Sequence, residues 1–265
     1  VAQAIEDHYK PRFAGDELPR NDVGLVVALA DKLETLAGMF GIGNLPTGDK
    51  DPFALRRHAL GVIRMLMERK LDLGLQDLWR SAVPAFGSLI QDPSSALNEF
   101  VLDRLSASLR EQGYSAQEVA AVLALQPDQL ADVTQRLQAV RAFSNLPEAP
   151  ALAAANKRIG NILKKADVSS GSAEVKTALL KEAAEIALHQ RMQVVVQQAD
   201  DLFEKGDYTA NLQALAVLRP QVDAFFDGVM VNAEQAELRM NRLNLLRQLH
   251  QAMNRVADLS QLVAG

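Results

Sequence analysis

The sequence has 265 residues, of which 48% are hydrophobic and 23% charged, with a formal net charge of −5. These values are typical of a globular protein of about one to three domains and exclude a disordered chain. The sequence has no cysteine, which excludes disulfides and thiolate metal sites, and the acidic balance argues against indiscriminate binding to nucleic acids.

Apolar residues recur at spacings of three and four along almost the whole chain, which predicts an all-α fold. The first well-defined helix is expected over 23–39, with Asp22 as its cap, and a Gly/Pro loop follows over 41–51. Asp51 is then expected to cap a helix whose first position is Pro52, where a missing N–H costs nothing.

The middle of the chain predicts three more helices. One runs from Ser94 to Glu111, where Gly113 stops it, and the next begins with Ser115 as its cap. A third is expected over 126–143. The segment SNLPEAP that follows, with two prolines in seven residues, is the best candidate for an internal linker.

The last part of the chain begins with an Ala-rich helix expected from about Ala151 to Lys165. A Ser/Gly break, DVSSGS, follows it. Three further helices are expected near 173–204, 209–231 and 233–259.

Motifs for catalysis, metals and nucleotides are weak. GNLPTGDK (43–50) has the glycine spacing of a P-loop, but Asp49 stands where the phosphate-binding lysine is needed, so a rigid connector is the better interpretation. The four histidines are scattered singly, which argues against a zinc site. No Ser/His/Asp or Cys/His arrangement emerges, so no catalytic residue is predicted.

Asp31 and Lys32 lie in an apolar helix, in the stretch LADKLETL. The last metal-ligating Asp of the HD superfamily of metal phosphohydrolases lies in a similar stretch. That chemistry also needs a His-Asp pair, and the sequence contains no such dipeptide. We therefore interpret Asp31 as a structural helix residue, an HD-like remnant only, and expect neither a metal nor a cofactor in this chain.

A cluster of basic residues is a more informative signal. In ANKRIGNILKK (155–165) the helical period places several side chains on one face: Lys157, Arg158, Asn161, Lys164 and Lys165. Four positive charges and an amide in an acidic protein indicate a local anion-binding surface. A solvated helix face is the alternative interpretation.

Arg242 projects from the middle of an apolar stripe in the last long helix. A buried arginine needs a carboxylate or a polar ligand, and Asp223 and Asp227 precede it in the sequence. The residue is expected either to form a structural ion pair with one of them or to present its guanidinium to a nucleic acid. The ion pair is the favoured alternative.

Several stretches together resemble the β subunit of bacterial-type glycyl-tRNA synthetase (glycine–tRNA ligase). They are HYKPRFAGDELP (8–19), VVALADKLETLAGMFGIG (26–43), PTGDKDPFALRRHALGVIRML (46–66), LAAANKRIGNILKK (152–165) and FFDGVMVNAEQAELRMNRLNLL (225–246). The resemblance implies a C-terminal fragment with three parts. These are the C-terminal part of an HD-like helical domain (1–82), a helical linker that can pack with the following domain (83–147), and a DALR-type helical anticodon-binding domain (148–265).

The resemblance also implies a function. The parent enzyme would be a cytoplasmic α2β2 heterotetramer that joins glycine to tRNA(Gly), with ATP and magnesium at the α subunit and tRNA recognition by the β subunit. The expected partners are therefore tRNA(Gly) and the α subunit, with neither DNA nor a membrane, and the fragment alone is expected to be inactive. Two alternatives stay open, a degenerate HD-type phosphohydrolase and a purely structural helical scaffold for the α subunit.

Glycine anticodons carry two cytosines, which are read by a carboxylate or carbonyl at N4 and by Arg, Lys or an amide at the acceptors. We predict that anticodon-stem phosphates contact Lys157, Arg158, Lys164 and Lys165. The residues predicted to lie near the bases are Asn161, Asp227, Asn232, Arg239 and Arg242. Phe225 and Phe226 are the available aromatic stacking partners.

Overall fold

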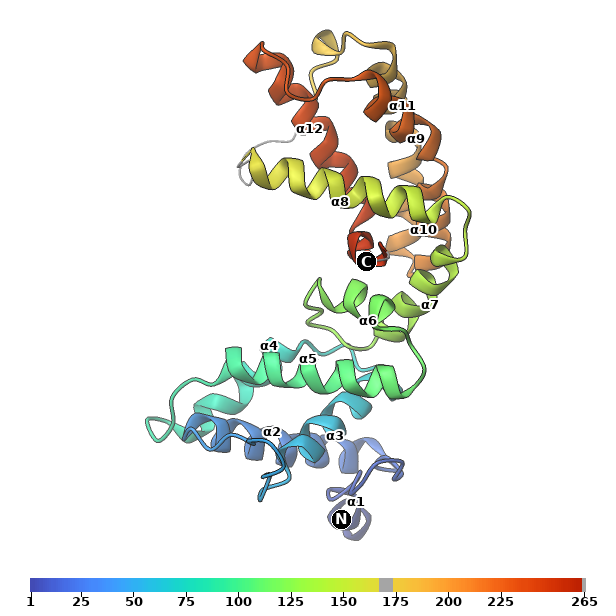
Figure 1. Cartoon of the computed structure of the whole chain (residues 1–265). Coiled ribbons are helices and arrows are strands. Elements are labelled where there is room, and N and C mark those ends of the chain that lie inside the picture. The colour runs from blue at the N-terminus through green and yellow to red at the C-terminus, as the bar shows by residue number, and fades with distance from the viewer. Residues whose placement is uncertain (167–173, 264–265) are drawn as a thin grey trace. The chain divides into compact units, whose positions relative to one another are not determined.

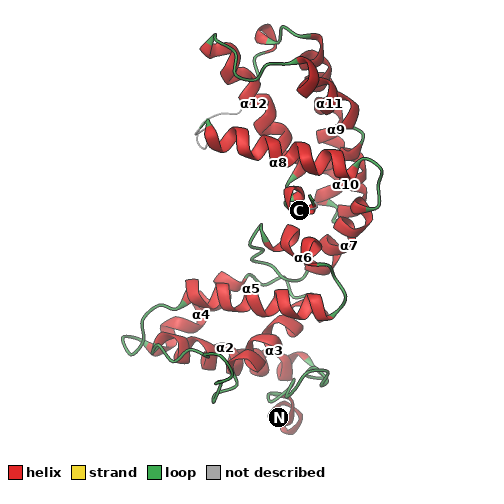
Figure 2. Cartoon of the chain, viewed as in Figure 1, coloured by secondary structure: helices red, strands yellow, loops and turns green. Residues whose placement is uncertain are grey.

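The computed structural model describes residues 1–166 and 174–263, and every regular element within them is a helix (Figures 1 and 2). The all-α prediction is thus confirmed. In these ranges no helix combines the length and the apolar character that a membrane span needs. The predicted Ser/Gly break falls on residues outside the described ranges.

The chain divides into two compact units. Unit 1 comprises Val1–Tyr114 and Gln126–Thr134, and unit 2 comprises Ser115–Leu125 and Gln135–Gly265. The segment 83–147, expected as a linker, is shared between them, since its first part belongs to unit 1 and most of the remainder to unit 2.

Unit 1 is built around α2, which packs against α1, α3, α4 and α5. The apolar face of α2 forms part of the core of unit 1, in which Leu36, Leu66 and Trp79 are fully buried. The Trp79 indole donates a hydrogen bond to Asn98 Oδ1 at 3.1 Å, which satisfies its polar atom. The helices of this unit are α1 (Ala2–Asp7), α2 (Asp22–Gly41), α3 (Leu55–Glu68), α4 (Leu75–Ala82), the 3-10 helix η1 (Val83–Phe86) and α5 (Ser94–Glu111).

The starts of α2 and α3 differ from the expected ones. Asn21, not Asp22, caps α2, because its side chain accepts a hydrogen bond from the Gly24 N–H at 2.9 Å. The Asp51 carboxylate does accept hydrogen bonds from the first N–H groups of α3, at Leu55 (2.8 Å) and Arg56 (3.0 Å). Asp51 itself, however, lies several residues before the helix begins. Pro52 therefore precedes α3 and does not open it.

The start of α4 is capped from a distant part of unit 1. The carbonyl of Asp128 accepts from the Leu75 N–H at 2.9 Å, and its carboxylate accepts from the Gln76 N–H at 2.8 Å. Gly74 makes this approach possible, since a Cβ there would lie 2.2 Å from the Asp128 carboxylate. Residues 126–134 are thereby tied to unit 1.

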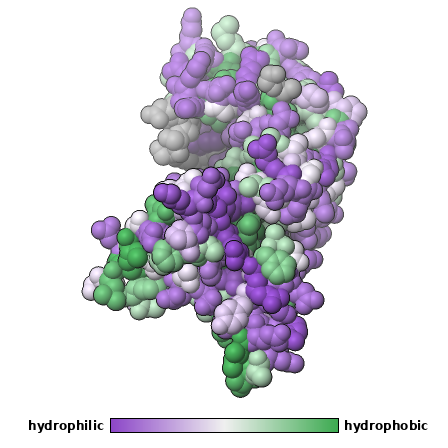
Figure 3. All heavy atoms as spheres, turned by 60° about the horizontal axis from the view of Figure 1, so that its bottom comes forward, coloured by the Kyte–Doolittle hydropathy of each residue, from purple (hydrophilic) through white to green (hydrophobic). Residues whose placement is uncertain are grey.

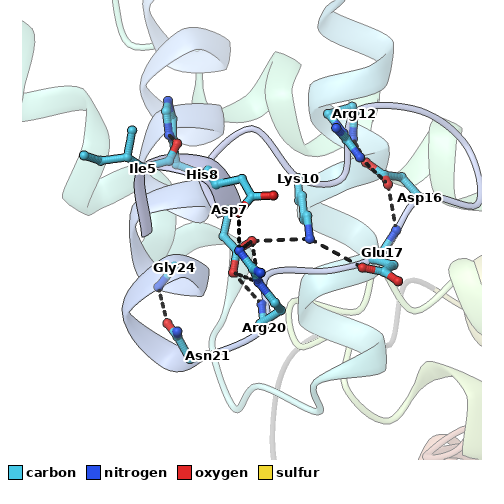
Figure 4. A network of polar contacts seen from close by, with 11 residues as sticks. Ile5, Asp7, His8, Lys10, Arg12, Asp16, Glu17, Arg20, Asn21 and Gly24 are labelled. Atoms are coloured by element: carbon cyan, nitrogen blue, oxygen red, sulfur yellow. Dashed lines mark hydrogen bonds and ion pairs between the residues drawn. The ribbon is translucent and has the colours of Figure 1, made fainter. Parts of the chain in front are cut away.

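An ion-pair network fixes the segment between α1 and α2 (Figure 4). Asp7 is fully buried and accepts from the backbone N–H of Arg20 at 2.9 Å and from its guanidinium at 3.1 Å. The Lys10 ammonium lies 3.3 Å from Asp7 and 3.4 Å from Glu17. The hydrogen bonds from Arg20 lower the pKa of Asp7 to about 2.

We expect Asp7→Asn to destabilise unit 1 at neutral pH and to do so less and less as the pH falls. A lowered folded-state pKa means that the carboxylate stabilises the fold above its unfolded pKa of about 4. That contribution is lost as the pH falls toward about 2. Urea unfolding followed by fluorescence of Trp79, the single tryptophan, measures it. Glu6→Gln, at an exposed partner of Arg20, is the control, and a pH-independent difference between Asp7→Asn and the unchanged chain would contradict the assignment.

Unit 2 is built around α12, which packs against α8, α9 and α10 and buries Leu243, Leu245, Leu246 and Leu249. The helix expected over 209–231 is two helices, with Pro220 in the first turn of the second. The helices described are α6 (Ala116–Leu123), α7 (Val133–Ser144, whose first two residues belong to unit 1), α8 (Ala149–Lys165), η2 (Thr177–Leu179), α9 (Ala183–Glu204), α10 (Tyr208–Ala216), α11 (Arg219–Gly228), α12 (Ala236–Met253) and η3 (Leu259–Leu262).

The short helix α6 is tied to unit 2 at both ends. Ser115 and Glu118 form the predicted cap as a reciprocal capping box, and Arg141 donates to Glu118 at 2.7 Å and 2.9 Å. Near its other end, the Ala121 carbonyl accepts from the Asp258 N–H at 2.8 Å, and α6 packs on η3.

Exposed large apolar side chains are frequent in the first part of unit 1. They include Ile5 (61% exposed) near the start of the chain and Val23 and Val26 (both 65%) on α2. On the face of the molecule seen in Figure 3, groups of hydrophobic residues lie among hydrophilic ones.

Candidate functional site

The structure brings five of the predicted site residues together on the outer face of α8. Lys157, Arg158, Asn161, Lys164 and Lys165 are all exposed. The opposite face of the helix is buried through Leu152, Ala153, Asn156 and Ile159. We call these five residues the α8 basic face. Within the described ranges, none of its four cations pairs with a carboxylate, so their charge is available to an anionic ligand.

Arg158 is held in place by an aromatic ring. Its guanidinium carbon lies 4.2 Å from the ring centroid of Phe226 on α11, a cation–π distance. Phe226 in turn meets Phe225 edge to face, with ring centroids 5.6 Å apart. Phe225 is fully buried, which corrects its assignment as a stacking partner for a base. One side of the Phe226 ring is already covered by Arg158.

Three of the residues predicted near the bases are exposed but lie on other elements. Asp227 is near the end of α11, Asn232 is in the loop that follows, and Arg239 is in the first turn of α12. The Arg239 guanidinium donates to the Ala233 carbonyl at 3.1 Å, which fixes it beside that loop. Both α11 and α12 pack against α8, so these residues and the α8 basic face belong to neighbouring elements of one unit.

Arg242 is a structural residue. It is 4% exposed, its Nε donates to the fully buried carboxylate of Glu185 on α9, and its Nη1 donates to the Met230 carbonyl at 2.7 Å. The ion pair is confirmed, but its partner is Glu185 and not Asp223 or Asp227. A base could reach this guanidinium only by breaking the pair, so burial argues against the predicted base contact.

The Glu185 carboxylate accepts hydrogen bonds from the backbone as well as from Arg242. Its second oxygen accepts from the N–H groups of Lys181 (2.8 Å) and Glu182 (2.9 Å). Burial acts to raise its pKa, but the Arg242 hydrogen bond and the two backbone donors outweigh burial and hold the pKa below its usual range. The carboxylate therefore stays ionised beside Arg242.

An amide-lined pocket of about 390 Å³ lies between α9 and α12, and the sequence analysis missed it. Gln193 and Gln197 line it from α9, and Gln248 and Gln251 line it from α12. Arg255 closes one side, paired with Glu204 at 2.9 Å. Side-chain amides both donate and accept hydrogen bonds, so this pocket suits a ligand with a mixed polar edge. Glutamines spaced three and four apart on two helices were the available signal.

A second pocket, in unit 1, contains Asp31. It measures about 250 Å³ and is also lined by Tyr9, Arg12, Lys32, Arg57 and His58. The described part of the chain holds no group of three or more His, Cys, Asp or Glu side chains that could bind a metal ion.

Comparison with known proteins gives two family matches. Residues 1–124 match the family described as glycyl-tRNA synthetase beta subunit, and residues 152–260 match the DALR anticodon binding domain. All residues of the α8 basic face and all those predicted near the bases lie within the second range.

Curated relatives match over the whole chain. The glycine–tRNA ligase beta subunits of Janthinobacterium sp. (strain Marseille) and Polaromonas naphthalenivorans (strain CJ2) are 68% and 69% identical over 264 residues. That of Paracidovorax citrulli (strain AAC00-1) is 70% identical over 266 residues. Each alignment covers 100% of this chain but only 37–38% of the relative. The chain thus spans little more than a third of the length of these relatives.

Proposed function

Because this chain belongs to the glycyl-tRNA synthetase beta subunit family, we propose that it serves tRNA(Gly) recognition in a glycine–tRNA ligase and that unit 2 reads the anticodon. In this proposal the aminoacylation site, with its ATP and magnesium, belongs to a separate α subunit in an α2β2 assembly. The enzyme works in the cytoplasm, and the present chain is inactive by itself.

The α8 basic face is the observation that carries the proposal. It concentrates four cations, none with a carboxylate partner among residues 1–166 and 174–263, on one exposed helix face of a chain whose net charge is −5. Such a face attracts the phosphates of an RNA stem, which supports RNA binding by unit 2. The cation–π contact with Phe226 orients Arg158 at this surface before any ligand arrives.

Base reading requires groups of both kinds beside that face. Cytosine presents an N4 donor and N3 and O2 acceptors, so it needs a carboxylate or carbonyl together with an amide or a guanidinium. Asp227 supplies the first, and Asn161, Asn232 and Arg239 supply the second, all of them exposed. The amide-lined pocket offers the same chemistry at another place in unit 2 and is the competing location.

The direct test is binding of a tRNA(Gly) anticodon hairpin over a series of salt concentrations, beside a hairpin in which both cytosines are replaced by uracil. We expect preference for the cytosine hairpin, with base contacts contributing about 1–3 kcal/mol each. Equal, salt-sensitive binding of both hairpins would contradict base reading and leave phosphate contacts alone.

Two variants locate the reading residues. Asp227→Ala is expected to lower the preference for cytosine, whereas Gln251→Ala, at an exposed position of the amide-lined pocket, is expected to leave it unchanged. The reverse outcome would move the reading site to the pocket between α9 and α12.

A scaffold role is the second candidate, and it concerns unit 1. Val23 and Val26, one helical turn apart on α2, are exposed apolar side chains and give α2 an apolar surface that suits a protein partner. We propose that this surface contacts the α subunit. Pull-down of purified α subunit should then be weakened by Val23→Ser with Val26→Ser, while hairpin binding by unit 2 is unchanged.

A further inference from the structure

The pocket of about 250 Å³ in unit 1 contains a buried ammonium group without a counterion. Lys32 lies in the middle of α2 and is 3% exposed. Its Nζ donates to the His8 carbonyl at 3.3 Å, which is a long hydrogen bond, and it makes no ion pair within the described ranges. Burial of an unpaired charge is unfavourable, and this burial lowers the pKa of Lys32.

The neighbouring helix is shaped to admit this lysine. Gly61 on α3 faces the Lys32 side chain, and a Cβ at that position would lie 2.8 Å from Lys32 Cε. Any larger residue at position 61 would push the lysine away from its place beside the pocket. The packing therefore accommodates Lys32 where it is, although the ammonium has only the long hydrogen bond to the His8 carbonyl there.

His58, on α3, is a second polar group with an unmet hydrogen bond. Its Nδ1 is buried and has no partner within the described ranges. Burial, and then the nearby Lys32 ammonium, lower the pKa of His58 and favour the neutral ring. Buried polar atoms without partners are rare in folded proteins, and His58, which lines this pocket, carries one of them.

The other charged side chains of the pocket differ in whether they already have an ionic partner. Arg12 is paired with Asp16 through hydrogen bonds of 2.9 Å and 3.1 Å. Arg57 is exposed and has no carboxylate partner in the part of the chain that the structure describes. Asp31 is exposed at the same pocket and supplies a single acceptor group.

We propose that this pocket binds a phosphate or phosphomonoester group. Lys32 and Arg57 supply positive charge, the neutral His58 ring adds a hydrogen bond, and the ligand oxygens provide the Lys32 ammonium with acceptors beyond the His8 carbonyl. Asp31 selects for a ligand that carries a hydroxyl hydrogen, because a carboxylate accepts from P–OH and repels a fully ionised anion. Hydrogen phosphate and the singly ionised form of a phosphomonoester meet this requirement, and sulfate does not.

The test is thermal unfolding and calorimetric titration with sodium phosphate, sodium sulfate and adenosine 5′-monophosphate at equal ionic strength. We expect phosphate to raise the melting temperature and to bind at least about tenfold more tightly than sulfate, since binding to the folded state stabilises it by mass action. Adenosine 5′-monophosphate separates the two sources of the group. Tighter binding than phosphate indicates a nucleotide, and weaker binding indicates the free ion.

Three variants of pocket residues and one control variant make the proposal falsifiable. Lys32→Met keeps the length of the side chain and is expected to abolish the phosphate-dependent shift, whereas the same change at the exposed Lys50 retains it. Arg57→Gln, at an exposed site that leaves folding intact, is expected to weaken phosphate severalfold. Asp31→Asn is expected to bring sulfate binding up to that of phosphate.

Two results would overturn the assignment. One is the absence of any phosphate effect on the unchanged chain, and the other is an equal effect in Lys32→Met or in Arg57→Gln. Equal binding of sulfate and phosphate by the unchanged chain would remove the selective role given to Asp31.

Discussion

Replacement of Glu185 by glutamine is expected to lower the free energy of unfolding of unit 2 by about 3–5 kcal/mol, because removal of one partner leaves the other charge buried and unpaired. The carboxylate is fully buried, and it joins the Arg242 guanidinium to the residues just before α9 through the Lys181 and Glu182 N–H groups. Hydrogen exchange of unit 2 amides under native conditions measures the loss, since the single tryptophan belongs to unit 1.

Two controls separate the buried charge from general damage. Glu182 is a second carboxylate near Arg242, at 3.9 Å, but its side chain is 56% exposed, so Glu182→Gln is expected to change stability by less than about 1 kcal/mol. The double variant Glu185→Met with Arg242→Met removes both charges and is expected to recover much of the loss. An equal loss in the two single glutamine variants would contradict the assignment of Glu185 as the partner that matters.

Removal of the four cations of the α8 basic face is expected to flatten the salt dependence of hairpin binding by about three units of log K per log salt, at about 0.7–0.9 for each phosphate contact. Between about 50 and 200 mM salt the unchanged chain should then lose about 60-fold more affinity than the variant. Preference for the cytosine hairpin should be unchanged, because phosphate contacts carry no sequence information. The variant combines Lys157→Ala, Arg158→Ala, Lys164→Ala and Lys165→Ala.

A control variant removes three exposed cations from other parts of unit 2, namely Lys181, Arg191 and Lys205. It is expected to leave the salt slope within about one unit of the unchanged chain. If both variants flatten the slope alike, the RNA responds to the net charge of unit 2, and the α8 basic face has no special role.

Local signals in the sequence predicted the helices well and their ends less well. The helix from Ser94 to Glu111 and the cap at Ser115 follow from periodicity and capping chemistry alone. The shift of α3 to begin after Pro52 depends on a left-handed backbone conformation at Ala54, which alanine rarely adopts and periodicity does not reveal. Capping of α4 by Asp128 joins residues 52 apart in sequence, beyond the reach of any local rule.

In the candidate site, too, the features within one helix were predictable from the sequence and those that join distant residues were not. The α8 basic face was predictable, since one helix carries all its residues at a fixed spacing. The partner of Arg242 was not, because Glu185 lies 57 residues away and two nearer aspartates fitted the sequence equally well. The amide-lined pocket and the pocket beside Lys32 each need two packed helices, so only the fold could assemble them.

The path of the chain between the two units has a practical consequence. It passes from one unit to the other after residues 114, 125 and 134, so α6 is contributed to unit 2 by a detour, and residues 126–134 return to unit 1. No single cleavage of the backbone therefore yields two complete units. A protease cut near residue 130 would separate α6 from the rest of unit 2, and a cut just before residue 128 would also separate α4 from its Asp128 cap. Exchange of unit 2 between related proteins by recombination would need three matched junctions instead of one, which favours inheritance of the two units together.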